Sequence, residues 1–148
     1  MANVHFTVIR DLPLPADVAF AELIDWRGHA EWVPMTRVTI EAGDGGPGTV
    51  FVATSGLGPA ALPDRMRVDS LDATAMTVRI TKIGPVLTGY VDLSVIATGA
   101  STSRLMWLED INVPVLPRFL ARPVGAAARK AFAVSIDRMA KHARRTRA

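Results

Sequence analysis

The alternation of hydrophobic and polar residues predicts a strand, two short helices and then a long β-rich region. Val4–Arg10 alternates apolar with polar positions, the pattern of a strand with one buried face. After a proline-containing turn, apolar residues at helical spacing predict a short helix over Ala16–Asp25. A second helical turn is expected over Trp26–Glu31. Pro34 ends it, because the residue before a proline disfavours helical geometry.

From residue 36 onward the period of the pattern changes to two, which predicts six further strands. They are expected at Thr36–Glu41, Thr49–Ser55, Arg65–Asp69, Met76–Lys82, Val91–Val95 and Arg104–Asn112. Because short turns connect them, we expect consecutive hairpins and therefore an antiparallel meander. The loop Gly56–Pro63 is apolar where loops are usually polar, which makes it a candidate lid or contact surface.

The last segment, Pro117–Ala148, reads as one long helix whose periodic run starts at Pro123. On a helical wheel one half carries apolar and small residues, namely Ala121, Val124, Ala128, Ala131, Phe132, Ser135 and Met139. Charged residues cluster on the opposite side. The centre of the apolar half is small, so its large members Phe132 and Met139 would project towards the sheet and leave a cavity between helix and sheet.

These elements predict an α+β fold with a seven-stranded antiparallel sheet, two short helices after the first strand and a long C-terminal helix. At 148 residues the chain is expected to form a single domain, 1–148. It contains no cysteine, which excludes disulfides, cysteine zinc sites and thiol nucleophiles. The start has no basic segment followed by an apolar run, and no apolar run of about 18 residues occurs. We therefore expect a soluble, cytoplasmic protein.

Positive charge is concentrated in the terminal helix. Residues 118–148 carry nine Lys or Arg and one acid, whereas residues 1–117 have a net charge of −5. We favour a solvated helix face. No nucleic-acid partner is expected, because few aromatic residues accompany these charges. The alternative is an interaction module that reaches a partner or an anionic membrane through Arg144, Arg145 and Arg147, or through the apolar loop.

Along its whole length the chain resembles the helix-grip fold of the START and birch-pollen-allergen (SRPBCC) superfamily. Glu41–Thr49 is similar to the glycine-rich G-x-G-G-x-G loop of the plant pathogenesis-related allergens. Asp25-Trp26, Glu31–Pro34 and Arg104–Trp107 are similar to the bacterial polyketide cyclase/dehydrase-like branch. The resemblance implies a hydrophobic cavity for lipids, polyketides, or other aromatic or isoprenoid molecules. That superfamily includes binders, carriers and enzymes, so membership does not choose among them.

Inward-facing strand and helix positions give the expected ligand-binding residues. They are Trp32, Met66, Val68, Val78, Ile80, Val91, Leu93, Trp107, Val124, Ala128, Phe132, Ser135 and Met139. For the tryptophans, a structural role in the core is favoured over stacking on a ligand.

Lys82 and Glu109 are the candidate catalytic residues, because alternation places both on inward faces. A buried charge must pair, shift its pKa or contact a ligand, so either residue could orient a ligand or act as acid or base. The alternative, which we favour, is that both lie near strand ends and reach water. A register slip of one residue would instead turn Met106, Leu108 and Asp110 inward.

Other chemistries receive little support. The glycine-rich loop joins two strands and lacks the Gly-Lys-Ser/Thr ending of a phosphate-binding loop, so a conformational role is expected. His5, His29 and His142 do not have metal-ligand spacing, and neither a metal nor a cofactor is expected. Thr54-Ser55-Gly56 is not a nucleophile elbow. The leading hypothesis is binding of a small hydrophobic molecule. The alternatives are an aromatase/cyclase-type enzyme that uses Lys82 or Glu109, and the interaction module.

Overall fold

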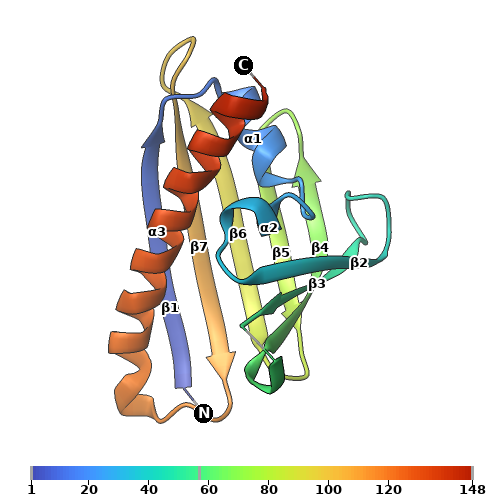
Figure 1. Cartoon of the computed structure of the whole chain (residues 1–148), viewed down its shortest axis with the longest axis vertical. Helices are drawn as coiled ribbons and strands as arrows, with labels where there is room; N and C mark the ends of the chain where they lie inside the picture. Colours follow the sequence, from blue (N-terminus) through green and yellow to red (C-terminus); the bar gives the residue numbers. More distant parts are fainter. Residues whose placement is uncertain (1, 57, 148) are drawn as a thin grey trace.

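The computed structural model describes residues 2–56 and 58–147, in which a curved antiparallel sheet packs against one long helix (Figure 1). The chain begins with β1 (Ala2–Leu12), α1 (Ala16–Leu23) and α2 (His29–Trp32). Six strands follow, with the short 3₁₀ helix η1 (Gly58–Ala60) after the second of them: β2 (Thr36–Ala42), β3 (Val50–Ser55), β4 (Leu62–Asp72), β5 (Thr77–Ile83), β6 (Thr88–Ala97) and β7 (Ser103–Val113). The chain then forms η2 (Arg118–Leu120) and α3 (Ala121–Thr146).

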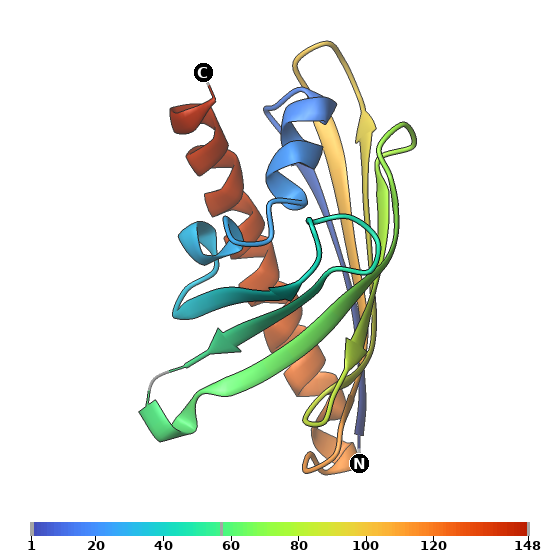
Figure 2. The same cartoon turned by 90° about the vertical axis from the view of Figure 1, so that its right-hand side faces the viewer.

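The sheet has the order β1-β7-β6-β5-β4-β3-β2, and every neighbouring pair is antiparallel. It is therefore a meander over β2 to β7, with β1 added beside β7. The sheet bends strongly, so that β2 and β3 cross in front of its flatter part and approach α3 (Figure 2). This arrangement is the expected helix-grip fold.

The inward faces of the central strands match the predicted alternation. On β7 the buried residues are Ser103, Leu105, Trp107 and Glu109, so the alternative register with Met106 and Asp110 inward is wrong.

Helix α3 begins at Ala121, within the predicted helical segment Pro117–Ala148 and two residues before the start of its periodic run at Pro123. Pro123 lies within the first turn, where a backbone N–H has no partner inside the helix and its loss costs little. The predicted orientation of the helix was slightly wrong. Val124 is 37% exposed and Ala131 is also exposed, whereas Ile136, absent from the predicted apolar face, is fully buried.

Gly125 lies where the helix packs against β1. A Cβ at Gly125 would lie 3.3 Å from the carbonyl oxygen of His5 and 3.5 Å from Val4 Cγ1, so the helix backbone lies close to β1 here. Gly125, rather than the neighbouring Val124, is therefore on the buried face. The buried stripe then continues through Ser135, Ile136, Met139, Ala140 and Ala143.

The C-terminal end of α3 is tied to α1 by a buried carboxylate. Glu22 is 2% exposed and accepts a hydrogen bond of 2.7 Å from Arg147 Nε, while His142 Nε2 lies 3.4 Å from its other oxygen. The basic end of the helix is thus partly neutralised by the body of the protein.

The glycine-rich loop is fixed in place by its own conformation and by Trp26. Gly43, Gly45 and Gly48 all have positive φ, which favours glycine. Trp26 Nε1 donates a hydrogen bond of 2.8 Å to the carbonyl oxygen of Gly45, and its ring stacks on Phe51. These contacts support the interpretation that the glycines of this loop serve its backbone conformation.

Among the boundaries that differ from the prediction, those of β4 and β5 affect the site. Strand β4 starts at Leu62 rather than Arg65, so part of the predicted apolar loop pairs with β3; Leu57 of that loop lies outside the described residues. Met76, predicted in a strand, has φ +55° and belongs to the turn before β5. The alternation rule counts Met76 as inward-facing, but it cannot detect a left-handed backbone.

Candidate functional site

A cavity of about 100 Å³ lies between the curved sheet, α2 and α3. Most of its wall is apolar and comes from strands β2 to β7. Its polar groups are His29, Thr36, Ser55, Asp64, Lys82 and Glu109. The cavity is smaller than the roughly 300–1,000 Å³ typical of ligand pockets. A ligand larger than a single ring must therefore extend out of it or expand it.

The predicted ligand-binding residues divide into three groups. Those that line the cavity are Met66, Ile80, Val91, Leu93, Trp107 and Phe132. Those packed in the core outside its lining are Trp32, Val68, Val78 and Met139, with Ala128 half-buried beside them. Ser135 is buried at a neighbouring groove, and Val124 is exposed, so its predicted place at the cavity is wrong.

Phe132 is the residue of α3 that lines the cavity. Its ring stacks on Phe6 at 5.5 Å between centroids and contacts the Trp107 ring at 4.9 Å. The small residues of α3 therefore do not create the cavity, as the wheel suggested. Close approach of the helix at Gly125 removes space there, and the cavity lies farther across the sheet.

A buried charge cluster occupies one side of the cavity. Lys82 and Glu109 are only 4% and 3% exposed, so the favoured interpretation that both reach water is wrong. Lys82 Nζ donates a short hydrogen bond to Asp64 and lies 3.8 Å from Glu109 Oε2. Trp107 Nε1 donates a 2.8 Å hydrogen bond to Glu109 Oε1. Asp64 Oδ1 is buried and has no hydrogen-bond partner among the described residues.

The position of this cluster follows from strand register and from Gly89. Lys82 lies opposite Gly89, and Gly89 lies opposite Ile111, two residues beyond Glu109 on β7. Because β6 has no side chain at Gly89, Lys82 can reach across it towards Glu109. Gly89 has φ +127°, and a Cβ there would lie 1.9 Å from the Asp110 carbonyl oxygen.

The surroundings raise the pKa values of both Lys82 and Glu109. Burial alone lowers the pKa of Lys82, but the carboxylates of Glu109 and Asp64 more than offset burial and hold this pKa above its ordinary value. Burial raises the pKa of Glu109, and the nearby ammonium of Lys82 offsets this only in part. Lys82 therefore remains charged, and Glu109 holds a proton more readily than an ordinary glutamate.

His29 also lines the cavity, although its sequence spacing suggested no role. Its Nε2 lies 2.7 Å from the carbonyl oxygen of Leu23, an acceptor, so this nitrogen carries the proton and Nδ1 keeps its lone pair. Burial lowers the pKa of His29 despite this bond. The imidazole is therefore neutral near pH 7, packed between the rings of Trp26 and Trp32.

Sequence reasoning missed Asp64 and Phe51 as well. Phe51 alternates with Ala53 and Ser55 along β3, and all three line the cavity, so extending the alternation rule to this strand would have found them. Asp64 gave no such signal, because it lies between the predicted loop, Gly56–Pro63, and the strand predicted from Arg65 onward.

An open groove of about 570 Å³ adjoins the cavity. It lies between α3 and the segment that joins α2 to β2, and Lys130 is at its edge. The groove shares four lining residues with the cavity, Val33, Thr36, Ser55 and Phe132. A hydrogen bond of 2.9 Å joins the hydroxyls of Thr36 and Ser55 at this shared boundary. The four shared residues therefore mark where the cavity and the groove meet.

Residues 2–56 and 58–147 contain no cluster of three His, Asp or Glu side chains placed to hold a metal ion. In the same residues, no helix has the length and apolar character needed to span a bilayer.

A curved antiparallel sheet closed by a long C-terminal helix over an apolar cavity defines the SRPBCC class of proteins. Residues 3–144 match the family described as polyketide cyclase/dehydrase and lipid transport. The chain belongs to this family. No curated protein matches the chain significantly.

Solved structures with the same fold extend over nearly the whole chain. The aromatase/cyclase ZhuI from Streptomyces sp. R1128 superposes with a TM-score of 0.80 at 18% identity, covering 97% of this chain and 94% of that one. Ara h 8.0201 gives 0.68 at 18% identity, over 93% and 98% of the two chains. The protein TTHA0849 from Thermus thermophilus gives 0.74 at 11% identity, over 95% and 96%. At these identities the likeness shows the fold alone.

Proposed function

We propose that the protein binds a small, mainly apolar molecule that carries a hydrogen-bond donor such as a hydroxyl or phenol group. The observation that carries this proposal is an apolar cavity whose wall includes one buried charge cluster with an acceptor, Asp64 Oδ1, that has no partner among the described residues. A buried acceptor without a partner is costly, and a ligand hydroxyl would satisfy it.

The charges of the cluster favour a donor over an anion. Two carboxyl groups face one ammonium, so when all three groups are ionised the cluster has a net charge of −1. A ligand carboxylate would meet this excess negative charge in a region of low dielectric constant. The apolar body of a longer ligand would pass Phe132 into the adjoining groove.

Naphthalene, 2-naphthol and 2-naphthoate test this chemistry directly. They share one ring system and carry no polar group, a hydroxyl and a carboxylate, respectively. We expect 2-naphthol to bind about tenfold more tightly than naphthalene, from one additional hydrogen bond, and 2-naphthoate to bind more weakly than 2-naphthol. Affinities are measured by calorimetry and by quenching of tryptophan fluorescence. Equal binding of 2-naphthoate and 2-naphthol would contradict the proposal.

A matched pair of variants locates the binding. Asp64→Asn changes the cluster, whereas Asp92→Asn removes a carboxylate from the outer sheet face, where Asp92 pairs with Arg79. In Asp64→Asn the amide oxygen would face the Lys82 ammonium and the NH2, a donor, would replace the acceptor Oδ1. We therefore expect this variant to weaken 2-naphthol binding about tenfold with little effect on naphthalene, and Asp92→Asn to change neither. Native mass spectrometry of the protein purified from its own host would then identify the class of any retained ligand.

A second candidate function is acid-assisted cyclisation or dehydration in the same cavity. It is favoured by Glu109, a carboxyl group with a raised pKa that lines the cavity of a member of the cyclase/dehydrase family. Protonated Glu109 would give its proton to a departing hydroxyl, which leaves as water. A carboxylate such as Asp64 would take the proton from the adjacent carbon, leaving a double bond.

The enzyme hypothesis is tested with a β-hydroxy ketone, 3-hydroxy-1-phenylpropan-1-one, whose dehydration product absorbs in the ultraviolet. We expect Lys82→Met and Glu109→Gln to abolish dehydration while binding of naphthalene persists. Normal turnover by the double variant would rule out this catalytic assignment.

A further inference from the structure

One end of the molecule carries exposed apolar side chains that the cavity does not use. Strand β7 ends at Val113, which pairs with Ala2, and Asn112 pairs with Thr88 at the start of β6. The turn before β6 and the segment 114–120 therefore leave the same end of the sheet. Figures 1 and 2 show both at the end where the N-terminus lies and where α3 begins.

Within segment 114–120 the large apolar residues fall into two groups by exposure. Leu116 and Leu120 are half-buried, whereas Val115 and Phe119 are 92% and 79% exposed. These are the two highest exposures of large hydrophobic residues in the described part of the chain. Val86, in the turn before β6, adds a further apolar side chain at this end, 36% exposed. Exposed apolar side chains rimmed by polar or charged residues are a feature of interaction sites.

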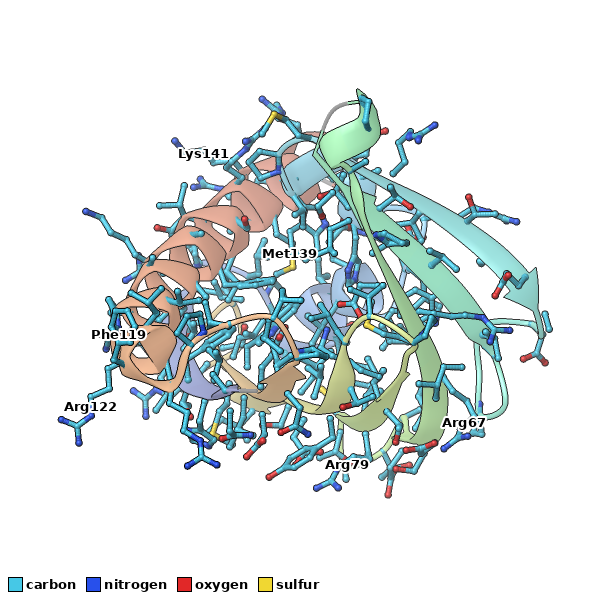
Figure 3. All side chains as sticks on the ribbon, turned by 90° about the horizontal axis from the view of Figure 1, so that it is seen from below. Arg67, Arg79, Phe119, Arg122, Met139 and Lys141 are labelled. Atoms are coloured by element: carbon cyan, nitrogen blue, oxygen red, sulfur yellow. The ribbon has the colours of Figure 1, made fainter. Side chains whose placement is uncertain are left out.

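Positive charge surrounds these side chains. Arg118 and Arg122 flank Phe119 and are exposed, and neither forms an ion pair with another described residue. No Asp or Glu occurs between Asp110 and Asp137. Figure 3 shows Arg122 projecting outward at the start of α3, with Phe119 of η2 at the same end of the helix, whereas Met139 lies in the interior.

We propose that this apolar-basic tip, formed by Val115, Arg118, Phe119 and Arg122, docks onto the surface of an anionic lipid membrane. The two apolar side chains would enter the boundary between headgroups and acyl chains. The guanidinium groups would bind lipid phosphates, whose geometry they match. The proposal does not depend on what the cavity holds.

Charge and shape favour a membrane over a protein partner. Val115 and Phe119 stand out singly from a protruding end, and neither lines the neighbouring hollow formed by Ala2, Asn3, Asn112, Arg118 and Ala121. They can be buried by a soft, deformable surface without shape complementarity. Charge complementarity identifies that surface as anionic, because the sequence from residue 111 to 136 carries only positive charges, at Arg118, Arg122, Arg129 and Lys130.

The test is co-sedimentation of the full chain with vesicles of phosphatidylcholine containing about 30% phosphatidylglycerol, compared with phosphatidylcholine alone. We expect binding to the anionic vesicles only, and weaker binding as salt increases. Arg118→Gln with Arg122→Gln should lower the partition coefficient about 25-fold, from about fivefold per arginine. Phe119→Ala should lower it about tenfold.

Two matched controls make the result specific to the tip. Arg144→Gln with Arg145→Gln removes the same charge about 33 Å away along α3. Val134→Ala truncates another exposed apolar residue of that helix. Both should leave the partition coefficient within about twofold of wild type. Circular dichroism confirms folding of every variant. The proposal is overturned if both arginine pairs weaken binding equally, if the C-terminal pair alone does so, or if the wild-type protein does not sediment with anionic vesicles.

Discussion

Replacing Lys82 with methionine tests the buried charge cluster on which the proposed function rests. Methionine has similar length and no charge, so the substitution leaves Asp64 and Glu109 facing each other without an ammonium between them. Removing one partner of a buried ion pair costs about 3–5 kcal/mol, because the remaining charge is uncompensated. For a chain of this size each kcal/mol lowers the melting temperature by about 2–4 °C. We therefore expect a decrease of about 6–20 °C near neutral pH.

The pH dependence of this loss is a further expectation. Without the ammonium, the pKa of Glu109 rises further above its ordinary value, so the folded variant takes up protons more readily than the unfolded chain. Its deficit in unfolding free energy should therefore shrink as the pH falls from about 7 to about 5. Urea denaturation of the wild type and the variant at both pH values measures the effect.

A triple variant separates lost charge balance from lost packing. Asp64→Asn, Lys82→Met and Glu109→Gln together remove every charge of the cluster, and such replacements are often neutral or stabilising. The triple variant should therefore recover most of the stability that Lys82→Met loses. If the unfolding free energy of Lys82→Met near neutral pH is within about 1 kcal/mol of the wild-type value, the reasoning is refuted, because the Lys82 ammonium would then reach water.

Three further substitutions probe other parts of the fold. Gly89→Ala should destabilise by at least about 1–3 kcal/mol in urea denaturation, from its positive φ and the contact with Asp110; unchanged stability would contradict that geometry. Arg147→Ala should cost about 1–3 kcal/mol, because buried Glu22 loses its hydrogen bond, and wild-type stability would show that this bond is weak in solution. Glu109→Gln should gain stability relative to wild type as pH rises from 4.5, because folding raises the pKa of Glu109 and ionisation then disfavours the folded state; a pH-independent difference would contradict this.

Periodicity predicted the sheet well, because each strand buries one face and the period of two survives small errors in strand limits. The inward placement of Lys82 and Glu109 followed from that period alone. The period did not predict how deeply the two side chains are buried. The strand-end argument gave them access to water, whereas in the structure both are buried and line a cavity whose wall also includes residues of β2 and β3. The curvature of the sheet depends on contacts that a one-dimensional pattern does not contain.

The helix illustrates a different limit. A wheel of mostly small residues has a poorly defined centre, because Ala, Gly and Ser add little contrast between buried and exposed positions. In the structure Gly125, not Val124, lies against β1. Val124 was therefore misplaced, while Phe132 and Met139, which are large enough to dominate their positions, were predicted correctly as inward-facing.

Asp64 shows why the complete charge cluster could not be predicted from the sequence. It occupies a strand that begins three residues earlier than predicted. A β-bulge between Val68 and Ser70 shifts the register of β4 against β5 between the connecting turn and the Met66–Lys82 pair. The ion pair of Asp64 with Lys82 therefore depends on a register that alternation cannot fix. The same holds for Gly89, whose missing side chain matters only once its neighbours are known.

The cluster also bears on whether the cavity serves folding or binding. A buried ion pair is weak evidence for stability, since apolar residues of similar volume often stabilise a protein as much or more. Under the proposed function, Lys82, Asp64 and Glu109 lie beside the apolar cavity because they recognise a ligand; the alternative is that they stabilise the fold. The triple variant decides between these explanations. If it is at least as stable as wild type but no longer distinguishes 2-naphthol from naphthalene, the charges serve recognition. If it unfolds more easily while the two probes still differ in affinity, they serve the fold, and the donor group of the ligand must be recognised elsewhere in the cavity.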